Sequence, residues 1–240
     1  MGVITFNSVQ STTVGINVET FPDYETPERD YEIIHVPGRN GDIVIDTGTY
    51  KNTSRSYKVS MVASSSLPYY KAMNKVAEWL QSGAGYCRLE DTYEPDYYSY
   101  AVYKQKTSFE NLFNEAGRAT LTFECKPQRF LKSGDNVVTF NSSGTITNPT
   151  KFSSLPIIVI TTNSTAGNVV IGNISFTVKA GAGTITVNSD TQDVYTGTAN
   201  KNQYITLLSG AFPKLDPGSN TISFSGGVTK LEITPKWWTI

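Results

Sequence analysis

The sequence predicts a mainly β protein, with an N-terminal α+β domain that carries one helix and a C-terminal antiparallel β-sandwich. Apolar residues alternate over short runs that end in turn-forming residues, which is the period of half-buried strands, and one stretch alone has helical spacing. Charged residues become sparse beyond about residue 130. With 240 residues, the chain is long enough for one large β domain or for two smaller ones.

Strand-like runs account for most of the N-terminal half. Residues 3–18 are expected to form a first strand pair, and residues 56–62 alternate as a later strand. Between them, residues 21–30 contain two prolines and several charged side chains, which indicates an exposed, irregular connection. Residues 117–125 form another amphipathic run, and we expect residues 126–130 to end that strand.

Residues 35–46 are the stretch around which we organise the N-terminal domain. Pro-Gly at 37–38 and Asn-Gly at 40–41 are turn-forming pairs, and the β-branched run at 43–45 leaves the turn as a strand. A phosphate-binding loop is disfavoured, because the glycine spacing is wrong and no helix follows. We therefore expect a tight reversal between strands, with Arg39 as a surface or interface contact.

A single helix is predicted after these strands. Ser66 is a candidate N-cap, Pro68 fits the first turn because it lacks an N–H, and Gly83 is placed to terminate the helix. We expect the apolar stripe between them to lie on a sheet, with Trp79 in the core. The stripe consists of Tyr69, Ala72, Met73, Val76, Trp79 and Leu80.

The C-terminal part has short strand-like runs, turn signals rich in glycine, and no helical period. These features are typical of an antiparallel β-sandwich. We assign residues 1–135 to the first domain and residues 136–240 to the second. The predicted strands of the second lie at 137–140, 157–160, 169–178, 184–187, 204–208, 221–224 and 231–234.

Charge and composition exclude several classes of partner and site. The formal net charge of -1 and the pI near 5.9 give no basis for binding nucleic acid or anionic lipid. No apolar run approaches the roughly 20 residues that span a bilayer, and the N-terminus does not resemble a secretion signal. His35 is the only histidine, and with two distant cysteines it makes no metal-binding pattern. Cys125 continues an apolar strand face, so we expect it in the core.

No catalytic arrangement stands out either. The sequence has no nucleophile elbow, and acidic pairs are common by chance among 21 carboxylates. Turn and surface roles are therefore expected for Asp91 and Glu94, and for Asp190 and Asp193. We predict a protein with no catalytic residues, no cofactor and no metal, that is, not an enzyme.

The tandem Trp237 and Trp238 close the chain. In an alternating strand one of them faces the core and the other faces solvent. An outward tryptophan can stack on a sugar or a partner, although an edge strand anchored by one buried tryptophan is the simpler interpretation. Tyr195 and Tyr204 are further candidate contacts for a glycan or partner.

Four ordered segments together resemble the distal tail protein family of long-tailed, non-contractile bacteriophages (siphophages). They are Val36–Asp46, Tyr50–Asn52, Phe123–Arg129 and Phe212–Ile222, and they spread over nearly the whole chain. The resemblance implies two domains: an N-terminal one with a tail-tube-like fold, which assembles into a hexameric ring, and a galectin-like C-terminal sandwich.

By the same resemblance, the chain is a structural virion protein at the tail tip, assembled in the host cytoplasm. Its implied partners are other copies of itself, the tail tube protein, the tail-associated hub or fibre protein, and a receptor-binding protein. We hypothesise that a stiff loop with an arginine capable of bidentate pairing makes contacts between subunits. The candidate interface residues are Pro37, Gly38, Arg39, Asn40, Gly41, Asp42 and Arg129.

An alternative function is a carbohydrate-binding adhesin that recognises host cell-wall glycan through the C-terminal sandwich, using Trp237, Trp238, Tyr195 or Tyr204. A galectin-like fold does not itself confer sugar binding. No stretch resembles the galectin sugar-binding motif, since Asn148-Pro149-Thr150 has no accompanying arginine. A glycan hydrolase is a third and poorer alternative.

Overall fold

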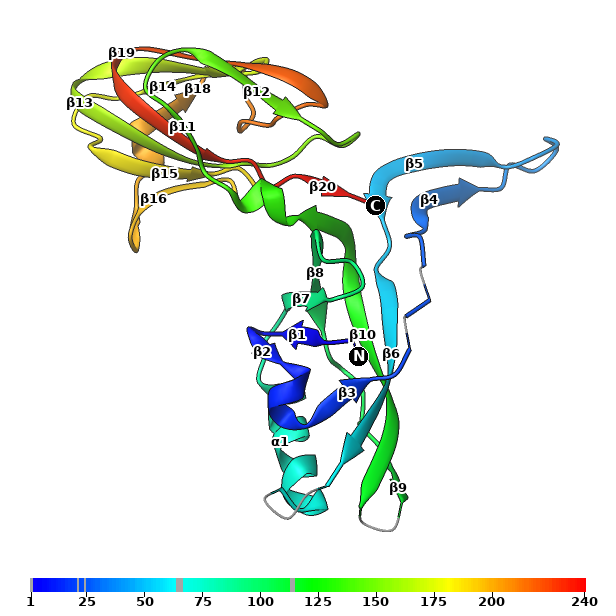
Figure 1. Cartoon of the computed structure of the whole chain (residues 1–240). Helices are drawn as coiled ribbons and strands as arrows, with labels where there is room; N and C mark the ends of the chain where they lie inside the picture. Colours follow the sequence, from blue (N-terminus) through cyan, green and yellow to red (C-terminus); the bar gives the residue numbers. More distant parts are fainter. Residues whose placement is uncertain (1, 21, 24, 64–66, 113–114) are drawn as a thin grey trace. The chain divides into compact units, whose positions relative to one another are not determined.

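The computed structural model describes residues 2–20, 22–23, 25–63, 67–112 and 115–240 (Figure 1). Its contacts divide the chain into two compact units. Unit 1 comprises Met1–Arg129 together with Ile240, and unit 2 comprises Phe130–Thr239. Each unit has a hydrophobic core of its own.

Unit 1 is an antiparallel sheet with one helix against it. The sheet runs in the order β2-β1-β7-β8-β10-β6-β3, with β9 beside β10, while β4 and β5 form a separate two-stranded sheet. The elements are β1 (Ile4–Phe6), β2 (Val9–Gln10), the 3-10 helix η1 (Ser11–Val14), β3 (Ile16–Val18), β4 (Arg29–Ile34), β5 (Ile43–Tyr50), β6 (Thr53–Val62), α1 (Tyr69–Gln81), β7 (Cys87–Asp91), β8 (Tyr97–Val102), β9 (Glu110–Leu112) and β10 (Ala116–Leu131).

Helix α1 packs on this sheet through the predicted stripe, with Ala72, Val76, Trp79 and Leu80 buried. The indole N–H of Trp79 donates to the Phe6 carbonyl at 3.1 Å, so the expected core position of Trp79 is confirmed.

Pro68 occupies the N-cap position, and its carbonyl accepts bonds from the first turn of α1. Ser66, the predicted cap, lies outside the described residues. At the other end, Ser82 occupies the C-cap position directly before Gly83, and its hydroxyl donates to the Trp79 carbonyl at 2.8 Å. A serine hydroxyl thus satisfies one of the terminal carbonyls of the helix.

Strand β10 does not end at residue 126, as the sequence suggested, but continues to Leu131. Its pairing with β6 ends where Cys125 lies opposite Thr53. Pro127 therefore has no β6 residue opposite it that would need an N–H donor, and proline is tolerated at such a position. Cys125 itself is buried, as expected.

The two units meet in sequence between residues 129 and 130, a few residues before the boundary that we assigned at 135/136. Residues 130–135 pack with unit 2. The Leu131 N–H donates to the Trp237 carbonyl at 2.9 Å, and the Lys236 ammonium lies 2.7 Å from Asp135. The change in composition at about residue 130 therefore coincides with the change of unit.

Unit 2 is one curled antiparallel sheet (Figure 1). Its order is β11-β19-β13-β15-β16-β17, with β12 on β19, β14 on β13 and β18 on β14. The elements are the 3-10 helix η2 (Lys132–Asp135), β11 (Val138–Phe140), β12 (Gly144–Asn148), β13 (Ile157–Ile171), β14 (Ile174–Val178), β15 (Thr184–Asn188), β16 (Asp193–Thr196), β17 (Ala199–Asn200), the 3-10 helix η3 (Asn202–Tyr204), β18 (Ile205–Leu207), β19 (Gly218–Thr234) and β20 (Trp238–Thr239). The mainly β fold is confirmed.

The sheet curls along the two long strands β13 and β19. They pair at both ends, but the register shifts between residues 161 and 167 of β13. Before the shift β13 also pairs with β15, and after it with β14, so one strand serves both halves of the sheet. At the shift, the backbones approach so closely that a Cβ on Gly227 would lie 1.9 Å from the Thr165 carbonyl oxygen.

We therefore expect Gly227→Ala to destabilise unit 2 by at least about 1–3 kcal/mol, the usual cost of overpacking. Gly85→Ala is the control, because a Cβ there has no neighbour within 4 Å. Thermal unfolding of both variants measures the effect. Equal melting temperatures would contradict the close approach of β13 and β19.

Candidate functional site

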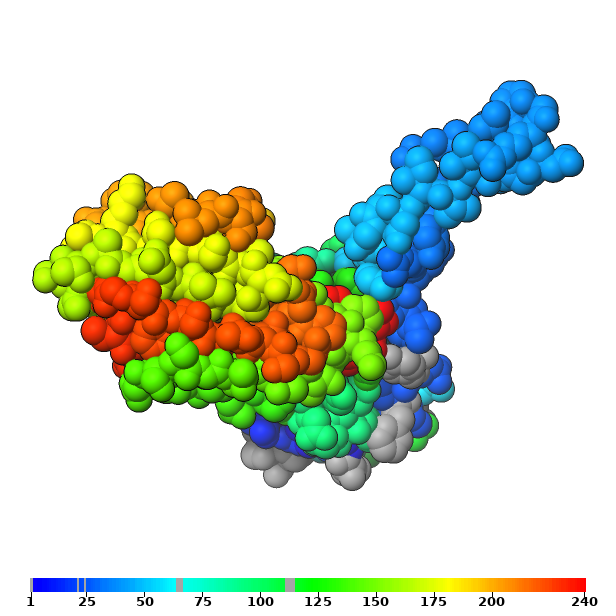
Figure 2. Space-filling model, turned by 90° about the horizontal axis from the view of Figure 1, so that it is seen from above, coloured from blue at the N-terminus to red at the C-terminus, as the bar shows by residue number. Residues whose placement is uncertain are grey.

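Strands β4 and β5 and the turn between them, residues 29–50, form a hairpin that we call the arm (Figures 1 and 2). Within the described residues, it pairs with neither of the larger sheets. In its register Ile33 lies opposite Val44, and Ile34 lies opposite Ile43. The predicted reversal between strands is confirmed, and the strand that leaves it, β5, runs to Tyr50.

Both faces of the arm are apolar. Successive side chains of a strand point to opposite faces, so Ile33 and Val44 share one face with Tyr31, while Ile34 and Ile45 lie on the other. Ile33 is 65% exposed and Val44 is 59% exposed. An isolated hairpin is marginally stable in water, and contiguous exposed apolar surface marks interaction sites. The arm is therefore the candidate interaction surface of unit 1.

The base of the arm is held by charged and hydroxyl groups. The Arg29 Nε lies 3.0 and 3.1 Å from the two Asp46 carboxylate oxygens, and Arg29 Nη1 donates to the Tyr50 hydroxyl at 3.0 Å. The hydrogen bond from Arg29 lowers the pKa of Asp46, and the same bond raises the pKa of Arg29. Exposed ion pairs contribute little stability, but this forked contact fixes the register of β4 against β5.

The tip of the arm is a glycine turn. Gly38 and Gly41 have φ of 81° and 80°, which favours glycine, and the Arg39 N–H donates to the Val36 carbonyl at 3.2 Å. Asp42 lies 2.9 Å from the ring nitrogen Nδ1 of His35. Residues 37–42 are all exposed, so the structure presents the predicted interface loop at the end of the arm.

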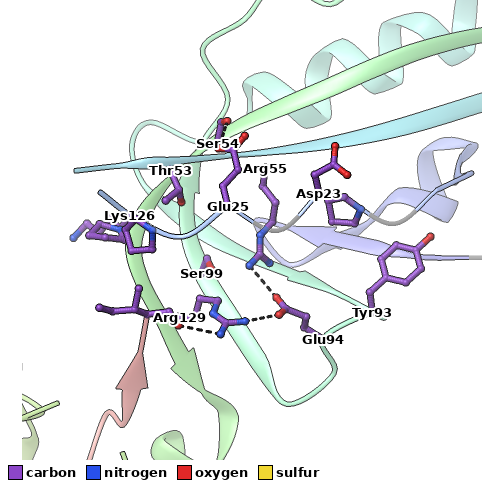
Figure 3. A pocket seen from close by; sticks show the side chains of 14 residues that line it. Asp23, Glu25, Thr53, Ser54, Arg55, Tyr93, Glu94, Ser99, Lys126 and Arg129 are labelled. Atoms are coloured by element: carbon purple, nitrogen blue, oxygen red, sulfur yellow. Dashed lines mark hydrogen bonds and ion pairs between the residues drawn. The ribbon is translucent and has the colours of Figure 1, made fainter. Parts of the chain in front are cut away.

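Arg129, the remaining predicted interface residue, lies in a different place. It lines a pocket in the body of unit 1 (Figure 3), to which none of residues 37–42 contributes. Its guanidinium pairs with Glu94, and its Nη2 donates to the backbone oxygen of Ile240 at 3.0 Å. Arg55 approaches the other oxygen of Glu94 at 2.9 Å. In this pocket, Arg129 and Arg55 therefore bind groups of the chain itself.

The expected turn role of Asp91 is confirmed, but its expected surface role is wrong. Asp91 is only 6% exposed, and its carboxylate accepts the Tyr57 hydroxyl at 2.7 Å and the N–H groups of Tyr93 and Glu94. Burial raises the pKa of Tyr57 well above 10.0, and the nearby charge of Asp91 adds a smaller effect in the same direction. Sequence reasoning missed this group because Tyr57 and Asp91 meet only when β6 and β7 enter the same sheet.

Both tryptophans of the tandem pair make contacts within unit 2. Trp237 is buried in the core, as one of the two was expected to be. Trp238 stacks on Phe152 with ring centroids 4.5 Å apart, and its indole N–H donates to the Ser153 carbonyl at 2.9 Å. Tyr195 and Tyr204 are partly exposed, and the Lys201 ammonium lies 4.8 Å from the ring centroid of Tyr204. The four aromatics do not form a common platform in any contact of the described residues.

No three His, Cys, Asp or Glu side chains form a possible metal site in the residues that the structure describes. Within the same residues, no helix is long and apolar enough to cross a bilayer.

Comparison with known families decides what kind of protein this is. The family model of the phage tail protein RIFT-related domain matches residues 4–125, just over half of the chain. The chain belongs to this phage tail protein family. The matched segment covers nearly all of unit 1 of this phage tail protein, including the arm.

Solved structures extend the likeness to both units of the phage tail protein. The Dit protein of phage SPP1, described as a paradigm of the hub adsorption apparatus in phages that infect Gram-positive bacteria, has a TM-score of 0.74 at 11% identity, with all of both chains covered. A chain of the phage P2 baseplate in its activated conformation with Ca has a TM-score of 0.56 at 12% identity, covering 97% of this chain and 96% of that one. No curated protein matches.

We expect Arg29→Ala to loosen the arm of this phage tail protein, because it removes the fork that joins β4 to Asp46 and Tyr50. Hydrogen exchange of the β4 and β5 amides measures the effect, which should be a loss of protection confined to the arm. Lys75→Ala is the control, since it removes a cation from an exposed position of α1, outside the arm. Equal protection in both variants would refute the role of Arg29.

We also expect the buried Tyr57 to make stability fall at alkaline pH. In the unfolded chain Tyr57 loses its proton near pH 10, whereas the folded protein retains it, so the folded state is destabilised as pH rises through this range. Tyr57→Phe removes this contribution. Its free energy of unfolding, measured with urea on both sides of pH 10, should decline less steeply than that of the unaltered protein. Parallel declines would contradict the raised pKa.

Proposed function

We propose that this phage tail protein is the subunit of a hexameric hub ring at the distal end of the tail. The ring joins the tail tube to the tail-tip or baseplate adhesion device. In this proposal the protein is a structural, non-enzymatic component of the virion, and each subunit contributes its arm to the contact with the next subunit.

The exposed apolar arm is the observation that carries the proposal. A hairpin with apolar side chains on both faces has no core of its own, so it gains stability only when other surfaces cover it. Burying a side chain such as Ile33 contributes about 1.5–3 kcal/mol. A head-to-tail contact that closes into a ring repeats this gain at every interface.

The likeness to the SPP1 Dit protein supports the hub part of the proposal. It extends over the full length of both chains, and that protein is described as a hub. The second likeness, to a chain of the phage P2 baseplate, fits the same position in the virion. Both likenesses are of fold, so the ring and its partners are our inference for this chain.

The proposed partners follow from the position of a hub. Unit 1 contacts neighbouring copies and the tail tube protein, and the opposite side of the ring receives the tail-associated hub or fibre protein. Unit 2, which we propose is a galectin-like domain, supports a receptor-binding protein. Assembly takes place in the host cytoplasm, and the final location is the tail tip.

The adhesin alternative has less support. The indole of Trp238 already stacks on Phe152, and its N–H donates to the Ser153 carbonyl. Trp237 is buried. A sugar site built on this pair would first have to break contacts within unit 2.

The mass in solution, combined with negative-stain images, tests the ring. The unaltered protein should give closed rings, and Ile33→Asp should remain monomeric because it places a charge on the apolar arm. Leu208→Asp, at an equally exposed residue of unit 2, should still form rings. A monomeric unaltered protein that binds cell-wall glycan would favour the adhesin instead.

The tip residues are tested separately. We expect Arg39→Ala and Asp42→Ala to raise the protein concentration needed for ring formation, because each removes a charged group from the proposed contact. Lys179→Ala, in unit 2, is the control for loss of a surface charge. If both tip variants form rings at unchanged concentration, residues 37–42 do not contribute to the subunit interface.

A further inference from the structure

The tip of the arm contains the chain's single Asn-Gly pair, Asn40–Gly41. Asparagine is a thermolabile residue, and its chemistry depends on the residue that follows it. The nitrogen of the next residue can attack the side-chain amide carbon, and glycine offers the least steric hindrance because it has no Cβ.

Both reacting groups of this pair belong to exposed residues. Asn40 is exposed, and no hydrogen bond of its side chain occurs among the contacts of the described residues. Gly41 is also exposed, and a Cβ built on it would have no neighbour within 4 Å. In this turn the backbone bond is donated by the Arg39 N–H, which leaves the Gly41 nitrogen outside it.

Asn188–Ser189 in unit 2 provides an internal contrast. The Asn188 side-chain oxygen accepts the Asp190 N–H at 3.0 Å, so its amide is held in place. The Ser189 nitrogen, which would be the nucleophile, donates to the Pro156 carbonyl at 3.1 Å, and Ser189 is buried. The same reaction at this pair requires local opening of unit 2.

We propose that Asn40–Gly41 is a spontaneous deamidation site of the free subunit. The Gly41 nitrogen loses its proton and attacks the Asn40 side-chain carbon; a C–N bond forms, the C–N bond to the side-chain nitrogen breaks, and ammonia leaves. Water then opens the cyclic imide at either carbonyl, which yields aspartate or isoaspartate. The net change is hydrolysis of an amide to a carboxylate, with no oxidant or reductant.

The product alters the part of the arm that we propose for subunit contact, so this step rests on the proposed function. A new negative charge appears between Arg39 and Asp42, and the isoaspartate form also lengthens the backbone of a tight turn. Inside a ring the tip is covered and its turn is held, which slows the cyclisation. Free subunits therefore lose assembly competence with age, while assembled subunits keep it.

Peptide mass spectrometry tests the chemistry without reference to assembly. The full chain is incubated as a monomer at mildly alkaline pH, then cut with a protease that leaves Asn40 internal, since trypsin would cleave after Arg39. The Asn40 peptide should acquire a carboxylate, with an isoaspartate form that separates on chromatography, while the Asn188 peptide stays unchanged. An unaltered Asn40 peptide, or equal conversion at Asn188, would overturn the proposal.

Ring formation tests the consequence. Aged protein and Asn40→Asp should show a loss of rings relative to fresh protein. Asn40→Gln is compared only with itself: its aged and fresh samples should assemble equally, because the longer side chain cyclises poorly. Equal assembly of aged and fresh protein would overturn the effect on assembly. If fresh protein forms no rings, the proposed function fails, and the mass measurement still decides the chemistry at Asn40.

Discussion

The antiparallel pairing of β6 with β10 is the interaction on which unit 1 depends. It runs without a break from Val62 opposite Ala116 to Thr53 opposite Cys125. This register places Tyr57 and Phe123 in the core, where their rings meet edge to face at 6.0 Å. The arm ends at Tyr50, just before β6 begins at Thr53, so the paired strand β6 anchors one end of the arm, while the tip lies outside the core.

In unit 1, the buried polar groups around Asp91 are hydrogen-bonded, whereas the apolar side chains of the arm are exposed. Around Asp91, a buried carboxylate receives a hydroxyl and two backbone N–H groups, which offsets the cost of its burial. On the arm, Ile33 and Val44 lie opposite each other across the strands, and both side chains are largely exposed. A stable interior together with an exposed apolar surface is what we expect of a subunit that joins a larger assembly.

Local patterns could be predicted because they depend on near neighbours in the chain. The stripe that buries Trp79 follows the helical period, Cys125 follows the period of a strand, and the turn at residues 37–41 follows from proline and glycine. The role of Arg129 was harder to predict. Its partners Glu94 and Ile240 are distant in sequence, and no local period indicates such a contact.

The sequence by itself determined the mainly β class, the single predicted helix, the turn at the arm's tip and the resemblance to phage tail proteins, because each depends on residue order or short-range spacing. Only the tertiary structure decided that Asp91 is buried, that Trp238 is stacked, and that both faces of the arm are uncovered. These are outcomes of long-range pairing. The alternation of a strand shows which side chains share a face, but not whether anything covers that face.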